Sequence, residues 1–274
     1  MNKIGILYIG IGSYLYFWED FYKSFEANFL PEAQKEYFVF TDADTVPFEA
    51  ENERIHRVYQ ENLGWPGNTL HRFRMFLGLE ERLRQFDYIF FMNANLYCLQ
   101  TVHEADILPG EGELLVVKHP RHLRKRPYQY PYDRNKKSLA YVPYKCLEAK
   151  EYVLGGINGG SPAVYLAMAA ECNRRIEEDL KRGVIAAWHD ESQLNRYIID
   201  YPSYRLGPPS FCYQEGWSFT FAPVILARTK EDYVTLDETK ANPPVLGRVR
   251  SRLRGMRMDF KYWRLARYFR RHGA

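Results

Sequence analysis

The sequence predicts an α/β protein in which a mostly parallel sheet forms a nucleotide-binding layer. Strands alternate with helices over the first 110 residues, a pattern that is typical of crossover connections between parallel strands. The run Asp-Tyr-Ile-Phe-Phe-Met at 87–92 is continuously apolar after its first residue, as expected for a central strand that is buried on both faces. With 274 residues, the chain is long enough to bury a substantial core.

The expected elements follow one another in a regular order. The chain begins with an Ile- and Leu-rich strand, and this strand ends at a glycine turn. Later, Ser161-Pro162 supplies an N-cap and an N1 residue for a helix that ends near Lys181. In chain order we expect a strand at 3–9, a helix at 14–29, a strand at 36–40, a helix at 68–85, strands at 87–92 and 114–118, a mobile loop at 120–144 and the helix from 161.

Composition excludes several classes of protein. Hydrophobic residues make up 46% and charged residues 26% of the chain, as in globular proteins. No run approaches the roughly 20 apolar residues that span a bilayer, and the N-terminus has no secretory pattern. The four cysteines lack a C-x-x-C pair, which favours free thiols in a reducing compartment. We therefore expect a cytoplasmic protein.

The net charge of +4 conceals a basic C-terminal tail. Residues 248–274 hold ten Lys and Arg residues and one carboxylate, Asp259, so the tail carries +9 and the first 247 residues carry −5. This distribution does not support a nucleic-acid footprint across the body. Helical spacing would gather Phe260 and Trp263 opposite many arginines, which is typical of an amphipathic helix on an anionic membrane surface, here its inner face. A tail that packs against the acidic body is the alternative.

Two polar turns follow predicted parallel strands, where ligands bind in α/β sheets. The first is Gly10-Ile11-Gly12-Ser13, which lacks the third glycine of a dinucleotide fingerprint because Leu15 stands there. The second is Asn93-Ala94-Asn95. Each turn is open to two interpretations, a structural turn or a ligand-facing edge.

Two further segments have unusual compositions. Residues 154–161 (Leu-Gly-Gly-Ile-Asn-Gly-Gly-Ser) place four glycines within six positions, which is unfavourable inside a helix or strand. A flexible loop or a close approach to a ligand would explain them. Trp188-His189-Asp190-Glu191 combines an aromatic face with carboxylates, as in carbohydrate sites, although two acidic residues also suit the first turn of a helix.

Together these segments resemble glycosyltransferase family 6, which contains the histo-blood-group A and B transferases and the α1,3-galactosyltransferases. The similarity is specific at 154–161 and 188–192 and weaker over about 4–230. It implies a GT-A fold, a UDP-sugar donor and transfer to O3 of a β-galactoside with retention at the anomeric carbon. It implies Glu191 as nucleophile or electrostatic stabiliser, acceptor contacts by His119, Trp188 and His189, and donor contacts by Ile9, Gly10, Ile11, Tyr14, Arg72, Asn93, Asn95, Leu154, Gly155, Gly156, Asp190, Arg228 and Lys230.

The resemblance also implies a donor sugar. Leu154-Gly155-Gly156 is similar to the A-type transferases, which use UDP-GalNAc, whereas galactose-specific members carry bulkier residues here. Glycine at 156 leaves room for the acetamido group. We therefore expect an α1,3-N-acetylgalactosaminyltransferase acting on an α1,2-fucosylated galactoside. A UDP-Gal-dependent α1,3-galactosyltransferase and a non-catalytic glycan-binding protein are the alternatives.

One departure from the mammalian members concerns the metal. Asn93-Ala94-Asn95 aligns with their Asp-x-Asp, which binds Mn²⁺. Hard divalent cations prefer anionic oxygen ligands, and two amides supply none. We therefore expect no metal cofactor, as in the bacterial branch of the family, which shares Asn-x-Asn. A cation must still meet the charge that develops on the leaving UDP, and Lys230 is the first candidate.

The expected organisation is a single catalytic domain with a tail. Residues 1–247 would form the GT-A domain, with the nucleotide-binding part at about 1–110 and the acceptor-binding part at about 111–247. Residues 248–274 would form the basic amphipathic tail.

Overall fold

A computed structural model of the protein describes residues 1–230 and Arg267. The domain boundary proposed at residue 247 and nearly all of the basic tail at 248–274 lie outside the described residues.

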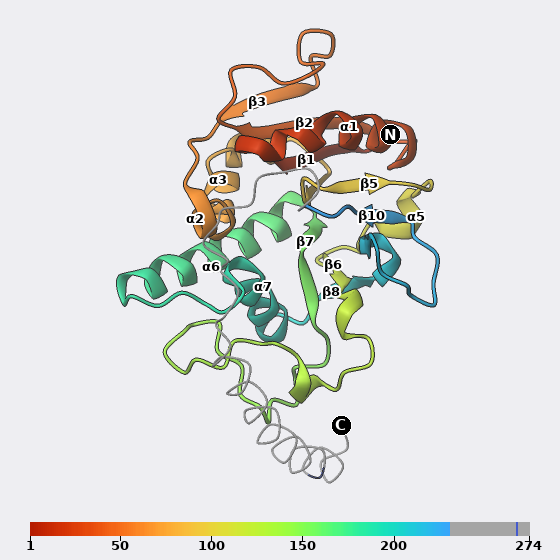
Figure 1. Cartoon of the computed structure of the whole chain (residues 1–274). Helices are drawn as coiled ribbons and strands as arrows, with labels where there is room; N and C mark the ends of the chain where they lie inside the picture. The colour runs from red at the N-terminus through yellow and green to blue at the C-terminus, as the bar shows by residue number, and fades with distance from the viewer. Residues whose placement is uncertain (231–266, 268–274) are drawn as a thin grey trace, which may run out of the picture.

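The fold is built on a seven-stranded mixed sheet with the strand order β3-β2-β1-β4-β7-β6-β8 (Figure 1). The strands β1, β2, β3 and β4 run parallel, and β7 is antiparallel to both of its neighbours, β4 and β6. A second sheet has the order β5-β10-β9. The strands are β1 (Lys3–Ile9), β2 (Gln34–Thr41), β3 (Ile55–Tyr59), β4 (Tyr88–Met92), β5 (Leu96–Cys98), β6 (Leu114–Lys118), β7 (Val153–Gly160), β8 (Tyr204–Gly207), β9 (Tyr213–Gln214) and β10 (Ile225–Ala227).

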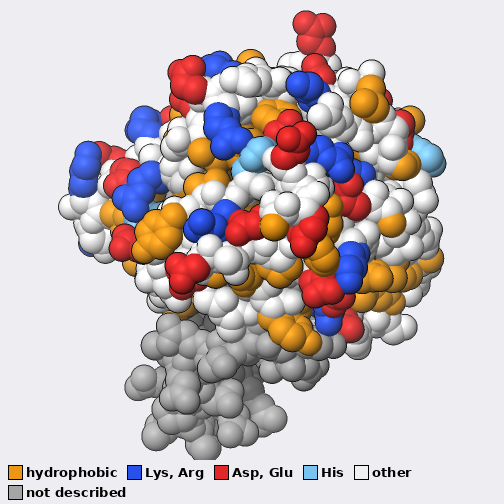
Figure 2. Space-filling model, turned by 90° about the horizontal axis from the view of Figure 1, so that it is seen from above, with side chains coloured by type: hydrophobic (Ala, Val, Ile, Leu, Met, Phe, Trp, Pro, Cys, Tyr) orange, Lys and Arg blue, Asp and Glu red, His pale blue; other side chains and the backbone are white. Residues whose placement is uncertain are grey.

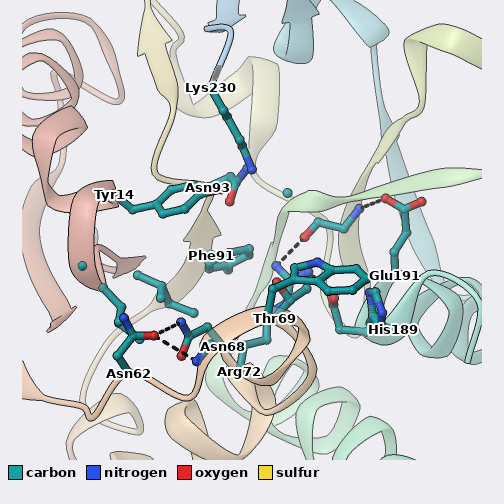
Figure 3. A pocket seen from close by; sticks show the side chains of 18 of the residues that line it. Tyr14, Asn62, Asn68, Thr69, Arg72, Phe91, Asn93, His189, Glu191 and Lys230 are labelled. Carbon is teal, nitrogen blue, oxygen red and sulfur yellow. Dashed lines mark hydrogen bonds and ion pairs between the residues drawn. The ribbon is translucent and has the colours of Figure 1, made fainter. Parts of the chain in front are cut away.

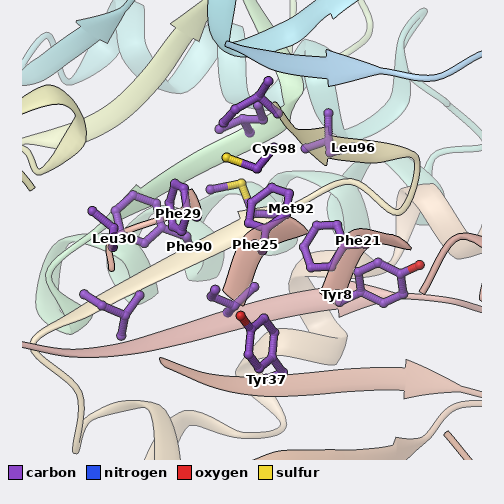
Figure 4. Close-up of a cluster of buried hydrophobic side chains, with 14 of the residues drawn as sticks. Tyr8, Phe21, Phe25, Phe29, Leu30, Tyr37, Phe90, Met92, Leu96 and Cys98 are labelled. Atoms are coloured by element: carbon purple, nitrogen blue, oxygen red, sulfur yellow. The ribbon is translucent and has the colours of Figure 1, made fainter. Parts of the chain in front are cut away.

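Helices cover both faces of the large sheet. The core on one face contains the aromatic side of α1, where Phe21 and Phe25 stack with ring centroids 4.1 Å apart (Figure 4). The core on the other face is formed largely by α3, α6 and α7. The α-helices are α1 (Trp18–Asn28), α2 (Gly64–Leu70), α3 (Arg72–Leu77), α4 (Glu80–Leu83), α5 (Glu104–Ile107), α6 (Pro162–Lys181) and α7 (His189–Asp200); the 3₁₀ turns are η1 (Gly12–Phe17), η2 (Pro120–His122), η3 (Pro127–Gln129) and η4 (Pro209–Cys212). This mixed α/β architecture in a single domain is that of a GT-A-like fold.

The glycine-rich segment is a central strand, so the flexible loop, one of the two explanations considered for its glycines, was wrong. The segment forms β7, between β4 and β6. A Cβ at Gly159 would lie 2.3 Å from Phe90 Cδ1 and 2.7 Å from the Ile89 carbonyl oxygen. Glycine is therefore needed where β7 passes a large aromatic side chain of β4, and the close approach offsets the cost of glycine in a strand.

The helix expected at 68–85 is divided into shorter pieces. α2 ends at Leu70, α3 ends at Leu77, and α4 spans only Glu80–Leu83. The hydrophobic spacing nevertheless holds, because Leu70, Phe73, Phe76 and Leu83 are all buried. The pieces keep one apolar face against the sheet while the chain turns at residues 71 and 78–79.

Candidate active site

A cavity of about 560 Å³ opens beyond the carboxyl ends of β1 and β4, beside the amino-terminal half of β7, which pairs antiparallel with β4 (Figure 3). It gathers twelve of the residues expected at the site from six separate segments. They are Ile9, Ile11, Tyr14, Arg72, Asn93, Gly155, Gly156, Trp188, His189, Asp190, Glu191 and Lys230. The positional rule for α/β sheets therefore located this pocket.

Five expected residues do not line the cavity. Gly10 and Leu154 lie behind its wall, where a Cβ at Gly10 would come within 2.8 Å of Tyr8 Cε1 and Leu154 is buried in the core. Asn95 is buried and accepts a hydrogen bond from Asn93. The remaining two, His119 and Arg228, point to other parts of the structure.

The pocket also contains side chains that sequence reasoning missed. Asn62, Asn68 and Thr69 form one wall together with Trp65. The Asn68 amide donates to Asn62 Oδ1 at 2.9 Å, which ties α2 to the segment that precedes it. The only sequence signal was the turn-forming run Gly64-Trp65-Pro66-Gly67, which does not reveal a ligand-facing wall.

Glu191 is held in one orientation at the edge of the cavity. The Tyr152 hydroxyl donates to its Oε1 at 2.7 Å, and the Gly155 amide donates to its Oε2 at 2.8 Å. Burial raises the pKa of the Glu191 carboxyl above its usual range, and these two hydrogen bonds and the charge of Arg72 oppose the rise. The result is a desolvated carboxylate whose two oxygens are both fixed by donors.

Asn195 connects the helix that carries Glu191 to the glycine strand. Its side-chain amide donates to the Val153 carbonyl at 2.7 Å and its Oδ1 accepts from the Val153 amide at 2.9 Å. Asn195 is fully buried. The first turn of α7 therefore has a fixed position relative to Gly155, which places both donors around Glu191.

Arg72 and Asp190 form a buried ion pair beside Glu191. Arg72 also donates to the Gly155 carbonyl oxygen at 3.0 Å, and its guanidinium lies 4.4 Å from the centre of the Phe91 ring. Burial lowers the pKa of Arg72 to about 10, so the side chain stays cationic at neutral pH. A Cβ at Gly155 would lie 2.9 Å from Arg72 Nη2 and 3.1 Å from Asp190 Oδ2, so a larger residue here would have to displace part of the ion pair.

The two asparagines that follow β4 are hydrogen-bonded to each other, and Asn95 is also bonded to the backbone of Arg228. Asn93 donates to Asn95 Oδ1 at 2.8 Å, and Asn95 donates to the Arg228 carbonyl oxygen at 2.5 Å. The Arg228 amide in turn donates to the Asn95 carbonyl oxygen at 2.9 Å. Asn95 thus joins Asn93 to the segment that leads to Lys230.

This pair of amides does not fit a hard divalent cation, which prefers anionic oxygen ligands. Neither residue offers a negative charge, and Asn95 Oδ1 already accepts a hydrogen bond. Among residues 1–230 and Arg267, no group of three or more His, Cys, Asp or Glu side chains is placed to hold a metal ion.

The two basic residues near the end of the described chain face different surroundings. The Lys230 side chain reaches over Asn93, and its Nζ lies 5.2 Å from the centre of the Tyr14 ring (Figure 3). Arg228 instead pairs with Asp20 of α1 at 2.6 Å and lies over the Phe17 ring. Lys230 is therefore the cation from this segment that lines the cavity.

Two of the three expected acceptor residues, Trp188 and His189, line the cavity at the start of α7. Trp188 is 53% exposed, and the His189 backbone has a φ of 50°, which places its ring against Trp65. His119 lies outside the cavity, with its ring 5.8 Å from the Tyr152 ring. Burial lowers the pKa of His119 to about 4, so this imidazole is neutral at physiological pH.

We expect the Tyr152→Phe variant to lower kcat about tenfold or more and to shift the pH profile. Glu191 loses a hydrogen bond that stabilises its ionised form, so its pKa rises and the acid limb of kcat/KM moves to higher pH. Tyr132→Phe is the matched control, because its hydroxyl donates at 2.5 Å to the Glu151 carbonyl oxygen in the same aromatic cluster. Equal pH profiles for wild type and Tyr152→Phe would contradict the expectation.

Comparison with known proteins agrees with this geometry. A sequence model of "Glycosyltransferase family 6" matches residues 2–236. The chain belongs to glycosyltransferase family 6. The O-antigen biosynthesis glycosyltransferase WbnI of Escherichia coli is 37% identical over 194 residues, which cover 71% of this chain and 81% of WbnI.

Two vertebrate members of the family are more distant. The histo-blood group ABO system transferase 1 of Rattus norvegicus is 27% identical over 79% of this chain. The globoside alpha-1,3-N-acetylgalactosaminyltransferase 1 of Gallus gallus is 26% identical over 77% of this chain. The aligned regions cover 63% and 62% of those proteins, so the chain spans less than two thirds of the length of each. Within residues 1–230, no helix is long and apolar enough to cross a bilayer.

Proposed function

We propose that the protein is a retaining transferase that moves GalNAc from UDP-GalNAc to O3 of a β-galactoside and forms an α1,3 linkage. The observation that carries this proposal is that two carboxylates, Glu191 and Asp190, lie beside Gly155 at the edge of a cavity large enough for a sugar nucleotide. Glu191 accepts from the Gly155 amide, and Asp190 pairs with Arg72. One relative is named as a globoside α-1,3-N-acetylgalactosaminyltransferase, which supports the sugar and the linkage.

In the proposed reaction, the bond between the sugar C1 and the UDP oxygen breaks, and a bond from C1 to the acceptor O3 forms on the same face. Glu191 stabilises the positive charge that develops at C1, by electrostatics or by a transient covalent bond. Asp190 holds donor-sugar hydroxyls. The O3 proton leaves with the departing phosphate oxygen or to solvent.

We further propose that no divalent metal takes part. The leaving diphosphate gains negative charge as the bond breaks. Among the residues that the structure describes, the Lys and Arg side chains that line the cavity are Lys230 and Arg72. A preorganised cation in a partly desolvated site stabilises such charge without reorganisation. The uracil would lie near Ile9, Ile11 and Tyr14, at the end of β1.

The proposal is tested by incubating the full chain with UDP-GalNAc or UDP-Gal and a fucosylated lactose, with EDTA and then with Mn²⁺. We expect an α1,3-linked GalNAc product, identified by NMR, with equal rates in EDTA and Mn²⁺. A faster reaction with UDP-Gal would favour the galactosyltransferase alternative. Activity that vanishes in EDTA and returns with Mn²⁺ would disprove metal independence.

The Gly156→Ala variant tests the donor assignment. A Cβ at Gly156 would lie 3.3 Å from both Asn93 Cβ and Leu154 Cδ1, so the added methyl group would narrow the cavity at this point. We expect the ratio of kcat/KM for UDP-GalNAc to that for UDP-Gal to fall about tenfold, because one methyl group is worth roughly 1–3 kcal/mol of discrimination. An unchanged ratio would remove Gly156 from donor selection.

A further inference from the structure

The positive charge of the described chain is concentrated in one segment between β6 and β7. Residues 121–150, here called the basic lobe, contain nine Lys and Arg residues and two carboxylates, Asp133 and Glu148, and so carry +7. The other 200 residues of 1–230 carry −9. A surface that is positive on an otherwise acidic body indicates a selective partner for that surface.

The cations of the lobe face solvent. Eight of the nine are exposed, and Arg134 is the exception; the eight are Arg121, Arg124, Lys125, Arg126, Lys136, Lys137, Lys145 and Lys150. The neighbouring Lys118 differs from them, because it is only partly exposed and pairs with Glu151 at 2.9 Å just outside the lobe. Of the two carboxylates, Asp133 is 2% exposed and accepts hydrogen bonds from the Asn135 and Ala187 amides.

The lobe is an ordered part of the fold. Tyr130, Tyr132 and Val142 form a small core with Tyr152. The lobe is joined to α6, where Asp179 accepts from the Ser138 hydroxyl at 2.8 Å. It is also joined to α7, where Arg196 donates to the Tyr141 carbonyl oxygen at 3.1 Å. The exposed cations therefore project from a segment that is anchored to α6 and α7.

The lobe lies at the end of the molecule far from β3 (Figure 1). The opposite end, above β2 and β3, mixes cations and carboxylates over one face (Figure 2). The lobe also adjoins the expected acceptor residues, because it follows His119 and because Asp133 binds the amide of Ala187, next to Trp188.

We propose that the basic lobe docks on an anionic phospholipid surface and so turns the acceptor side of the cavity towards the membrane. Each Lys or Arg near such a surface adds to the attraction, and eight exposed cations are enough for salt-dependent binding. Leu123, 37% exposed between Arg121 and Arg124, offers an apolar group that favours a lipid interface over a purely ionic partner. This docking brings the enzyme to an acceptor glycan that is carried on a lipid.

The test is co-sedimentation of the full-length chain with neutral phosphatidylcholine vesicles and with vesicles containing about one third phosphatidylglycerol. The variant Arg124→Glu/Lys125→Glu/Arg126→Glu reverses three cations of the lobe. The matched control is Lys23→Glu/Arg74→Glu/Arg84→Glu, which makes the same change in net charge at exposed positions outside the lobe. Circular dichroism verifies that both variants fold, and Lys136→Glu/Lys137→Glu/Lys150→Glu serves as a second lobe variant.

We expect wild type and the control to bind the anionic vesicles at low salt, and both lobe variants to bind at least tenfold more weakly. Equal binding by the lobe variants would assign any attraction to the basic tail and overturn the proposal. Failure of wild type to bind anionic vesicles, with salt-sensitive binding to heparin or DNA instead, would also overturn it. The vesicles contain no sugar nucleotide, so the outcome is independent of the proposed reaction.

Discussion

Replacing Glu191 with Gln is expected to lower kcat at least about 10³-fold, which corresponds to ~4 kcal/mol of transition-state stabilisation. The carboxylate charge is lost while the shape of the side chain is kept. The introduced glutamine would keep both contacts, because its oxygen can accept from the Gly155 amide while its amide donates to the Tyr152 oxygen. Binding of UDP-GalNAc, measured by calorimetry, should therefore change little.

The control for Glu191 is a carboxylate on the same helix that does not line the cavity. Asp200, at the end of α7, pairs with Arg175 and Arg196, and Asp200→Asn should retain most of the transfer activity. Near-normal kcat in Glu191→Gln would remove Glu191 from any direct part in the reaction. A loss of donor binding that matches the loss of kcat would instead make it a binding residue.

Replacing Lys230 with Ala is expected to lower kcat about 30- to 1000-fold, or ~2–4 kcal/mol. The reason is that the cation acts on charge that appears on the diphosphate only as the glycosidic bond breaks. The comparison variant is Arg228→Ala, which removes a cation two residues away that pairs with Asp20. We expect that change to cost much less.

Added Mn²⁺ provides a second readout for Lys230. If the lysine does the work of a metal, Mn²⁺ should not restore activity to Lys230→Ala, because Asn93 and Asn95 offer no anionic ligand. Lys230→Arg should retain a substantial part of the rate. Unchanged turnover in Lys230→Ala, or full rescue by Mn²⁺, would refute the assignment.

Much of the fold could be predicted because its signals are local. The apolar run at 87–92 identified the central strand β4, and Ser161-Pro162 located the start of α6. The glycine strand β7 could not be predicted, because Gly159 packs closely against Phe90 and Gly155 against Arg72. Both side chains are distant from these glycines in the sequence. The spacing of hydrophobic and glycine residues along the sequence does not reveal contacts between distant segments.

The site residues likewise divide into those recognisable from a local motif and those placed by contacts between distant segments. Glu191 and Trp188 stand out as a compact motif, and resemblance to a family supplied their expected roles. The support of Glu191 by Tyr152 depends on a contact between residues 39 apart, and the wall formed by Asn62 and Asn68 depends on how α2 meets the sheet. Asn95 was expected to face the donor, whereas it fastens the Arg228 backbone, a role that only the tertiary structure reveals.

The bond from Asn95 to residue 228 also has a consequence for biosynthesis. It joins positions 133 residues apart, and it precedes the lysine that completes the cavity. A nascent chain that has formed its first four strands still lacks this wall. The part of the cavity wall formed by Lys230 can therefore be added only after residue 230 has been synthesised, well after the residues of the first four strands.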